Sequence, residues 1–143
     1  MKPYKIGYTT GVFDLFHVGH LNILRRAKEQ CEYLIVGVST DELVQKYKFK
    51  VPVIPYHERV EIVEGIKFVD QVVPQTNRDK FSAWQKLLFN AMFVGDDWKG
   101  DPLFSEVENK FREVGVDIVY FPYTKGVSST ALKEKIKYKE KVI

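Results

Sequence analysis

The chain has 143 residues, 45% of them hydrophobic and 14% aromatic, which is enough for one continuous core and excludes a disordered chain. Its 22 basic and 19 acidic side chains leave a formal charge of +3, which suits a small anionic ligand and falls short of the basic stripe of nucleic-acid-binding proteins. The single cysteine, Cys31, excludes an internal disulfide, and no stretch approaches the roughly 20 apolar residues of a membrane span, so we predict one cytoplasmic domain over residues 1–143 with no membrane or nucleic-acid partner.

Strand and helix patterns alternate along the chain. A strand at Tyr4 to Thr10, a helix from about Gly19 to Gln30 and a strand at Tyr33 to Ser39 form a βαβ unit. Runs such as YLIVGV are apolar at consecutive positions, which is typical of parallel strands covered on both faces. We therefore predict an α/β fold with a Rossmann-like, doubly wound parallel sheet of five strands. The later elements are a helix over 58–69, a strand over 71–73, a helix over 79–89, a strand over 91–95, a helix over 105–114, a strand over 116–121 and a helix over 128–139.

Four distinctive segments follow the predicted strands. Ligands of doubly wound sheets bind beyond the carboxyl ends of the strands, near the topological switch point. We therefore expect these segments to converge on one crevice, and we read all four as loops that lead into the next element. They are GVFDLFHVGH at 11–20, STDELVQKYKFK at 39–50, GDDWKGD at 95–101 and PYTKGVSST at 122–130.

The first segment carries two histidines at the start of a predicted helix. Gly11 permits a tight turn, and Asp14, His17 and His20 follow into the helix N-terminus, which favours anions. Imidazoles three positions apart can point their N–H groups the same way and donate to one phosphate chain. The alternative is a structural pair without a ligand. The chain has no G-x-G-x-x-G here, which disfavours a dinucleotide-dependent hydride transfer.

The last segment is rich in hydroxyl groups. Gly126 precedes Ser128, Ser129 and Thr130, directly before a helical pattern. Ordinary helix capping explains such residues. Opposite a histidine pair on the same sheet edge, however, the hydroxyls and free amides would form a second phosphate cradle. The five lysines from Lys133 to Lys141 read as the polar face and tail of this helix, and we assign them no role.

Three motifs in this order, G-x-F-D-x-x-H-x-G-H, G-D-D-W and T-x-G-x-S-[ST]-T, resemble the cytidylyltransferase family, in particular its glycerol-3-phosphate members. The resemblance covers nearly the whole chain. The H-x-G-H element also occurs in adenylyltransferases and class I aminoacyl-tRNA synthetases, so it indicates nucleotidyl transfer but not the base. The other two motifs favour CTP.

The resemblance implies that a phosphate oxygen of a phosphorylated alcohol attacks the α-phosphorus of CTP and that pyrophosphate leaves. Catalysis then consists of positioning and electrostatic stabilisation, with Mg²⁺ as cofactor bridging the phosphates. His17 and His20 would donate to α- and β-phosphate oxygens. Lys46 and Lys48 would hold the acceptor phosphate and the developing charge, and Arg59 would act in the same cavity.

The resemblance also implies binding residues. Asp14 would orient a histidine or ligate the magnesium, and Trp98 would contact the nucleoside unless it belongs to the core. A homodimer is expected from the resemblance and from aromatic residues between Phe81 and Phe89. The residues for the nucleotide are Gly11, Val12, Phe13, Asp14, Gly19, Gly95, Asp97, Trp98, Thr124, Gly126, Ser128, Ser129 and Thr130, and those for the acceptor are Lys50, Lys67, Asp70, Arg78 and Lys80.

Several positions depart from the glycerol-3-phosphate pattern. Val12 replaces a threonine, Tyr123 replaces an arginine, and Lys67 keeps a charge but loses the bidentate fork of an arginine. Arg78 and Lys80 would supply cations that the segment after Pro74 otherwise lacks. The acceptor could therefore be another phosphorylated alcohol or a phosphonate. An adenylyltransferase and a catalytically silent nucleotide-binding module are the alternative functions.

Overall fold

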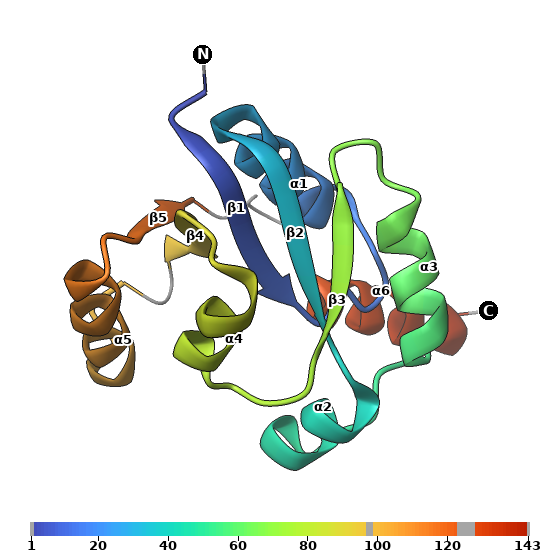
Figure 1. Cartoon of the computed structure of the whole chain (residues 1–143). Coiled ribbons are helices and arrows are strands. Elements are labelled where there is room, and N and C mark those ends of the chain that lie inside the picture. Colours follow the sequence, from blue (N-terminus) through green and yellow to red (C-terminus); the bar gives the residue numbers. More distant parts are fainter. Residues whose placement is uncertain (1, 97–98, 123–127, 143) are drawn as a thin grey trace.

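Strand β1 (Tyr4–Gly11) lies at the centre of the sheet. This computed structural model describes residues 2–96, 99–122 and 128–142, except for the side chains of 103 and 138–142. It pairs in parallel with β2 (Cys31–Ser39) on one side and with β4 (Ala91–Gly95) on the other. The edge strands are β3 (Gln71–Gln75) and β5 (Asp117–Phe121), in the order β3-β2-β1-β4-β5 (Figure 1). The predicted five-stranded parallel α/β fold is confirmed.

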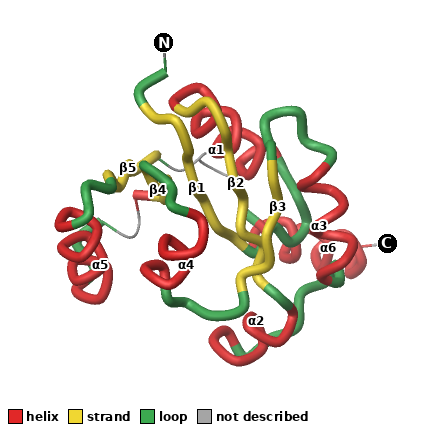
Figure 2. Tube along the Cα trace, viewed as in Figure 1, coloured by secondary structure: helices red, strands yellow, loops and turns green. Residues whose placement is uncertain are grey.

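Helices alternate with the strands (Figure 2). Leu24 of α1 and Val63 of α3 pack into one apolar cluster, whereas Phe104 and Phe111 of α5, with side chains of α4, pack into another. The sheet is therefore covered on both faces, as a doubly wound fold requires. Among the described residues no helix combines the length and apolar character needed to cross a bilayer. The helices are α1 (Val18–Gln30), α2 (Asp41–Lys48), α3 (Tyr56–Glu64), α4 (Lys80–Leu87), α5 (Pro102–Glu113) and α6 (Ser129–Val142).

Strand β2 shows why its sequence is apolar at consecutive positions. Leu34, Val36 and Val38 belong to the cluster that contains α1 and α3, and Ile35 belongs to the cluster on the other face. All four side chains are at most 3% exposed. Alternate residues of a strand point to opposite faces, so a strand buried on both faces needs an uninterrupted apolar run.

The segment after β2 differs from the prediction, because residues 41–48 form helix α2 and not a loop. The Thr40 side chain caps it by accepting from the amide of Leu43, and Phe49 ends it in the left-handed conformation at φ 55°. Helix α3 ends at Glu64 with Gly65 as its C-cap, earlier than expected. The lysines of the 39–50 segment therefore lie at the end of a helix and just beyond it.

The backbone at Gly7, in the central strand, is packed too closely for a side chain. A Cβ at this position would lie 2.5 Å from Cε2 of Phe93 and 2.7 Å from Sγ of Cys31, and both of these side chains are fully buried. We expect Gly7→Ala to lower the free energy of unfolding by about 1–3 kcal/mol, measured by urea titration. Gly65→Ala is the control, because its Cβ would approach no atom closer than 3.4 Å. A similar loss in both variants would contradict the packing argument.

Candidate active site

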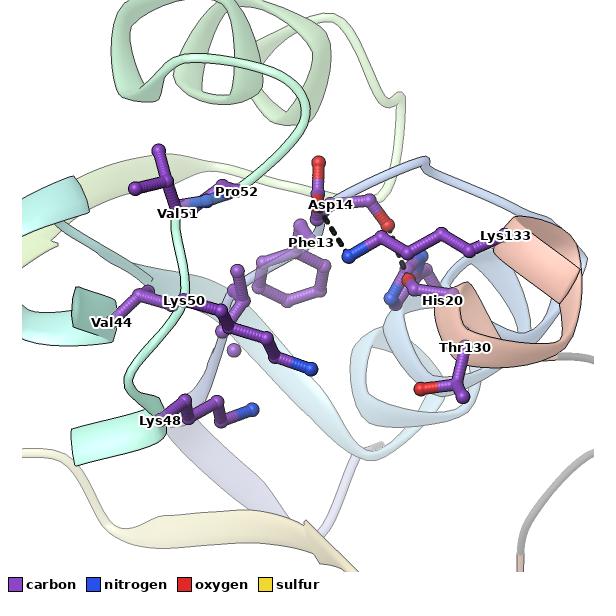
Figure 3. A pocket seen from close by; sticks show the side chains of 13 residues that line it. Phe13, Asp14, His20, Val44, Lys48, Lys50, Val51, Pro52, Thr130 and Lys133 are labelled. Atoms are coloured by element: carbon purple, nitrogen blue, oxygen red, sulfur yellow. Dashed lines mark hydrogen bonds and ion pairs between the residues drawn. The ribbon is translucent and has the colours of Figure 1, made fainter. Parts of the chain in front are cut away.

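A cavity of about 310 Å³ opens at the carboxyl edge of the sheet, where the loop after β1, the end of α2 and the start of α6 meet (Figure 3). The first and last segments of the chain are joined here, because the Ser129 hydroxyl donates to the backbone carbonyl of Asp14. The structure therefore brings these segments into one crevice. The lining residues are Gly11, Val12, Phe13, Asp14, His20, Val44, Lys48, Lys50, Val51, Pro52, Ser129, Thr130 and Lys133.

The loop between β1 and α1 has an unusual backbone. Phe13 and Leu15 both take left-handed conformations, with φ of 56° and 48°. For residues other than glycine this costs about 1–3 kcal/mol each and persists only where the surroundings enforce it. Here the Phe13 ring is 5% exposed and packs in the core, which anchors the loop. The result is a fixed turn that holds Asp14 at the cavity wall.

His17 and His20 close the first turn of α1 with their own side chains. Nδ1 of His17 accepts from the Gly19 amide at 3.0 Å, and Nδ1 of His20 accepts from the His17 amide at 3.2 Å. Because Nδ1 is the acceptor in both neutral rings, the ring proton of each is on Nε2. The rings stack with centroids 3.9 Å apart.

Both imidazoles are neutral near pH 7. Burial lowers the pKa of His20 to about 4, with a contribution from neighbouring His17. Burial also lowers the pKa of His17. Each ring therefore offers a neutral Nε2–H donor. His20 lines the cavity, and His17 stacks on it from outside the lining.

Asp14 ties three segments together. Its carboxylate oxygens accept from the amides of Val53 and Ile54 at 2.9 Å each, and Nζ of Lys133 lies 3.6 Å from Oδ2. Burial opposes the charge, but the two amide hydrogen bonds and Lys133 hold the pKa of Asp14 below its ordinary value. The carboxylate therefore fixes the loop before α3 against the loop before α1.

The described residues do not fit a metal ion held by the protein alone. Among them no group of three or more His, Cys, Asp or Glu side chains is placed to bind a metal. Of the described residues that line the cavity, Asp14 alone carries a carboxylate, and both of its oxygens already accept backbone amides. Mg²⁺ requires several oxygen ligands, so any magnesium would depend on oxygens of a bound substrate.

Of the three lysines around α2, the structure brings two into the cavity. Lys48 and Lys50 line it, whereas Lys46 is exposed outside the lining. Burial lowers the pKa of Lys48, and Lys50, Arg78 and Lys133 add to this as like charges. The cavity wall beside α2 is therefore strongly cationic.

Two further predicted acceptor residues lie near this wall, outside the lining. The Arg78 guanidinium lies 4.9 Å from the centroid of the Tyr47 ring. Nζ of Lys80 donates to Oγ1 of Thr10 at 3.0 Å, and burial and Arg78 lower the pKa of Lys80 to about 8. Thr10 directly precedes Gly11, so Lys80 lies close to the cavity rim.

Arg59 is buried beneath the cavity. Its side chain is 0% exposed, and its guanidinium donates to the carbonyls of Val12, Ser39 and Ile54 and to the Asp41 carboxylate. The structure therefore does not bring Arg59 into the cavity as expected, because its donors are engaged with the protein. Its place is that of a positioning residue that joins the loop after β1 to α2 and α3.

Lys67 and Asp70 lie at the wrong edge of the sheet for the predicted acceptor role. Both precede β3, and parallel strands begin at the edge opposite the cavity. Asp70 accepts from the amide of Leu34 and pairs with Lys28 at the end of α1, and Lys67 is exposed. The structure therefore contradicts these two assignments, because residues that precede a parallel strand lie at its amino end, away from the carboxyl edge where the cavity opens.

The remaining predicted residues surround the cavity less closely or lie elsewhere. Gly95 ends β4, and Ser128 caps α6 by accepting from the amide of Ala131 at 3.0 Å. Neither belongs to the lining. Asp97, Trp98, Tyr123, Thr124 and Gly126 lie outside the described residues.

The aromatic residues between 81 and 89 do not form the exposed patch expected for a dimer contact. Phe89 is 1% exposed and stacks on Tyr8, and Phe81 and Trp84 pack against the cluster around Phe111. Phe81 and Trp84 lie three positions apart on the side of α4 that packs on this cluster, and Phe89 follows the helix. This part of the dimer argument is therefore wrong.

Comparison with known proteins identifies the family. The model of the cytidylyltransferase-like family matches residues 8–135. The chain belongs to this family. The predicted membership is confirmed, and with it the nucleotidyltransferase class of enzyme. Members similar to this chain include a glycerol-3-phosphate cytidylyltransferase of Bacillus spizizenii, 41% identical over 88% of this chain and 92% of that protein, and one of Staphylococcus aureus, 35% identical over 90% and 92%.

Other relatives carry different names. An FAD synthase of Thermococcus sibiricus is 33% identical over 85% of this chain and 84% of its own length. Among solved structures, the lipopolysaccharide core biosynthesis protein of Thermoplasma volcanium superposes with a TM-score of 0.70 at 23% identity, over 87% of this chain and 99% of that one. This likeness shows the fold. The relatives of this chain therefore carry the names of more than one enzyme.

His20 gives the stability of this cytidylyltransferase-like protein a pH dependence. Its folded pKa of about 4 lies below the ordinary value of 6.5. Between these values the unfolded ring binds a proton and the folded ring does not, so stability is complete above about pH 6.5 and falls towards pH 4. We expect urea titrations to show this fall and His20→Gln to flatten it, whereas His57→Gln, at a 79% exposed side chain, keeps it. Equal slopes in the wild type and His20→Gln would contradict the burial of a neutral ring.

Proposed function

We propose that this enzyme transfers CMP from CTP to a phosphorylated alcohol, glycerol 3-phosphate in the first instance, and releases pyrophosphate. One observation supports the proposal above all. The neutral imidazole donor of His20, the N-terminus of α6, and Lys48 and Lys50 face one cavity. Relatives at 35–41% identity that are named glycerol-3-phosphate cytidylyltransferase favour this substrate pair.

The nucleotide would lie between α1 and α6. Nε2–H of His20 donates to phosphate oxygens, and His17 holds the His20 ring by stacking and capping. The hydroxyl of Thr130 and the first amides of α6 add neutral donors at a helix N-terminus, where anions are favoured. These donors stabilise charge on the phosphates by hydrogen bonding, and the His20 ring stays neutral because burial disfavours its protonated form.

The acceptor would bind beside α2. Lys48 and Lys50 hold its phosphate opposite the α-phosphorus, and Arg78 and Lys80 add positive charge at the rim. A phosphate monoester is mostly dianionic near neutral pH, because its second pKa is about 6. It can attack without a general base, so the residues contribute positioning and electrostatic stabilisation. Mg²⁺ stays a proposal, bound through the phosphates and not by Asp14 alone.

A substrate panel tests this function. We expect pyrophosphate release with CTP and glycerol 3-phosphate to exceed that with ATP, or with phosphocholine, phosphoethanolamine, ribitol 5-phosphate or aminoethylphosphonate, by at least about tenfold, a difference that one lost charged contact supplies. Release with ATP alone would favour an adenylyltransferase, which the FAD synthase relatives make the second candidate. Binding of CTP without release from any acceptor would indicate a silent binding module.

The imidazole donors give a second prediction. His20→Ala should lower kcat by about 10² to 10³, the usual effect of losing one preorganised donor to transition-state charge, and His17→Ala should lower it by a similar factor because the His20 ring is no longer held in place. His17→Asn restores a capping acceptor but not the ring, so it separates catalysis from helix stability. His57→Ala, at an exposed position, is the control. Rates near wild type in both alanine variants would exclude the assigned role.

The homodimer and the cytoplasmic location predicted from the sequence stay predictions. The resemblance to the family supports the dimer, now without the aromatic patch.

A further inference from the structure

Positive charge exceeds negative charge in the cavity lining. Lys48, Lys50 and Lys133 contribute three ammonium groups, and Asp14 contributes one carboxylate. In Figure 3 the three lysines point into the same space from two sides of the cavity. Such a cluster of like charges is favourable only when an anion lies among them. Lys133 is the member of this cluster for which we predicted no role.

Lys133 lies on the same face of α6 as the hydroxyl residues of the cavity. It follows Thr130 by three positions and Ser129 by four, which places all three side chains side by side along the helix. Its side chain is 28% exposed, so the ammonium group is partly enclosed by the cavity. Lys133 therefore extends the phosphate cradle at the start of α6 by one turn.

The contact between Lys133 and Asp14 is weak. Nζ lies 3.6 Å from Oδ2, whereas a charge-assisted hydrogen bond spans about 2.7–2.9 Å. Oδ2 already accepts from the amide of Val53 at 2.9 Å, and Oδ1 accepts from Ile54. Asp14 is held by these amides whether or not Lys133 is present. The ammonium group is therefore free to exchange this contact for a better acceptor.

We propose that Lys133 binds the β- and γ-phosphates of the nucleotide and leaves Asp14 when the triphosphate enters. The proposal rests on the proposed function for the identity of the nucleotide. A triphosphate lying along Thr130 and the N-terminus of α6 passes within reach of a lysine one turn further along the same face. Lys133 then supplies the charge, and the hydroxyl and amides supply the directed donors.

The alternative to phosphate binding is a purely structural role for Lys133. It would then serve only as a counter-charge to Asp14 and help to hold the loop that contains Val53. In that case its loss would lower the melting temperature and weaken every ligand alike. A phosphate-binding role instead weakens those ligands that carry a diphosphate. CTP, pyrophosphate and CMP separate the two, because CMP lacks the β- and γ-phosphates.

The experiment is isothermal titration calorimetry of the full chain with CTP, pyrophosphate and CMP. We expect Lys133→Met to raise the Kd for CTP and for pyrophosphate about tenfold and to change the Kd for CMP less than twofold. Lys133→Arg should restore most of the affinity. Lys135→Met is the matched control on the same helix, because Lys135 is exposed.

The outcomes distinguish this inference from the proposed function. Unchanged pyrophosphate binding in Lys133→Met would overturn the role of Lys133, as would an equal loss for all three ligands with a lowered melting temperature. Wild-type protein that binds pyrophosphate and ATP but not CTP would refute the cytidine specificity. A selective loss of pyrophosphate binding in Lys133→Met would support the role of Lys133 in that case too.

Discussion

The site depends on the enclosure of one carboxylate. Asp14 is 5% exposed, and a buried charge is tolerated only with hydrogen bonds and counter-charges around it. Two amides from the loop before α3 meet this need, and the Ser129 hydroxyl binds the carbonyl of the same residue. Segments 115 positions apart are thereby fixed around one cavity. The Asp14 carboxylate thus holds the loop before α3, and its backbone carbonyl holds the start of α6.

Arg59 is a second buried charge, and it binds the backbone on both sides of the Asp14 contacts, at Val12 and at Ile54. Arg59 joins the carbonyls after β1 and β2 to Asp41 at the start of α2, so it sets the direction in which α2 leaves the sheet. The two buried charges serve the same purpose. Both are satisfied by the protein itself and position the backbone, whereas Lys133 in the cavity lining makes only a long contact of 3.6 Å with Asp14 and can turn to a ligand.

Much of this architecture could be predicted from sequence, and the errors have physical causes. Runs of consecutive apolar residues predicted the strands that are covered on both faces, because such a strand has no position at which a polar side chain reaches solvent. Helix α2 escaped notice because it has eight residues and two buried side chains, Leu43 and Val44, too few for a clear period. Asp70 was assigned to the acceptor on the resemblance, although it precedes β3 and so lies at the amino end of that strand, opposite the cavity. Arg59 was predicted to lie in the cavity but is buried beneath it, whereas Lys133 was assigned no role but lines the cavity. Both errors arise because the burial and pairing of a cation depend on tertiary contacts.

The histidine caps have a consequence for how this site can change. Each ring must accept an amide on one nitrogen and present a donor on the opposite side. An amide side chain carries its acceptor and donor on one carbon, and an ammonium group has no acceptor, so neither substitute meets both demands. At these two positions the helix cap and the N–H donor therefore belong to the same side chain, and a substitution changes both. A change of ligand preference therefore requires substitutions at other residues that line the cavity.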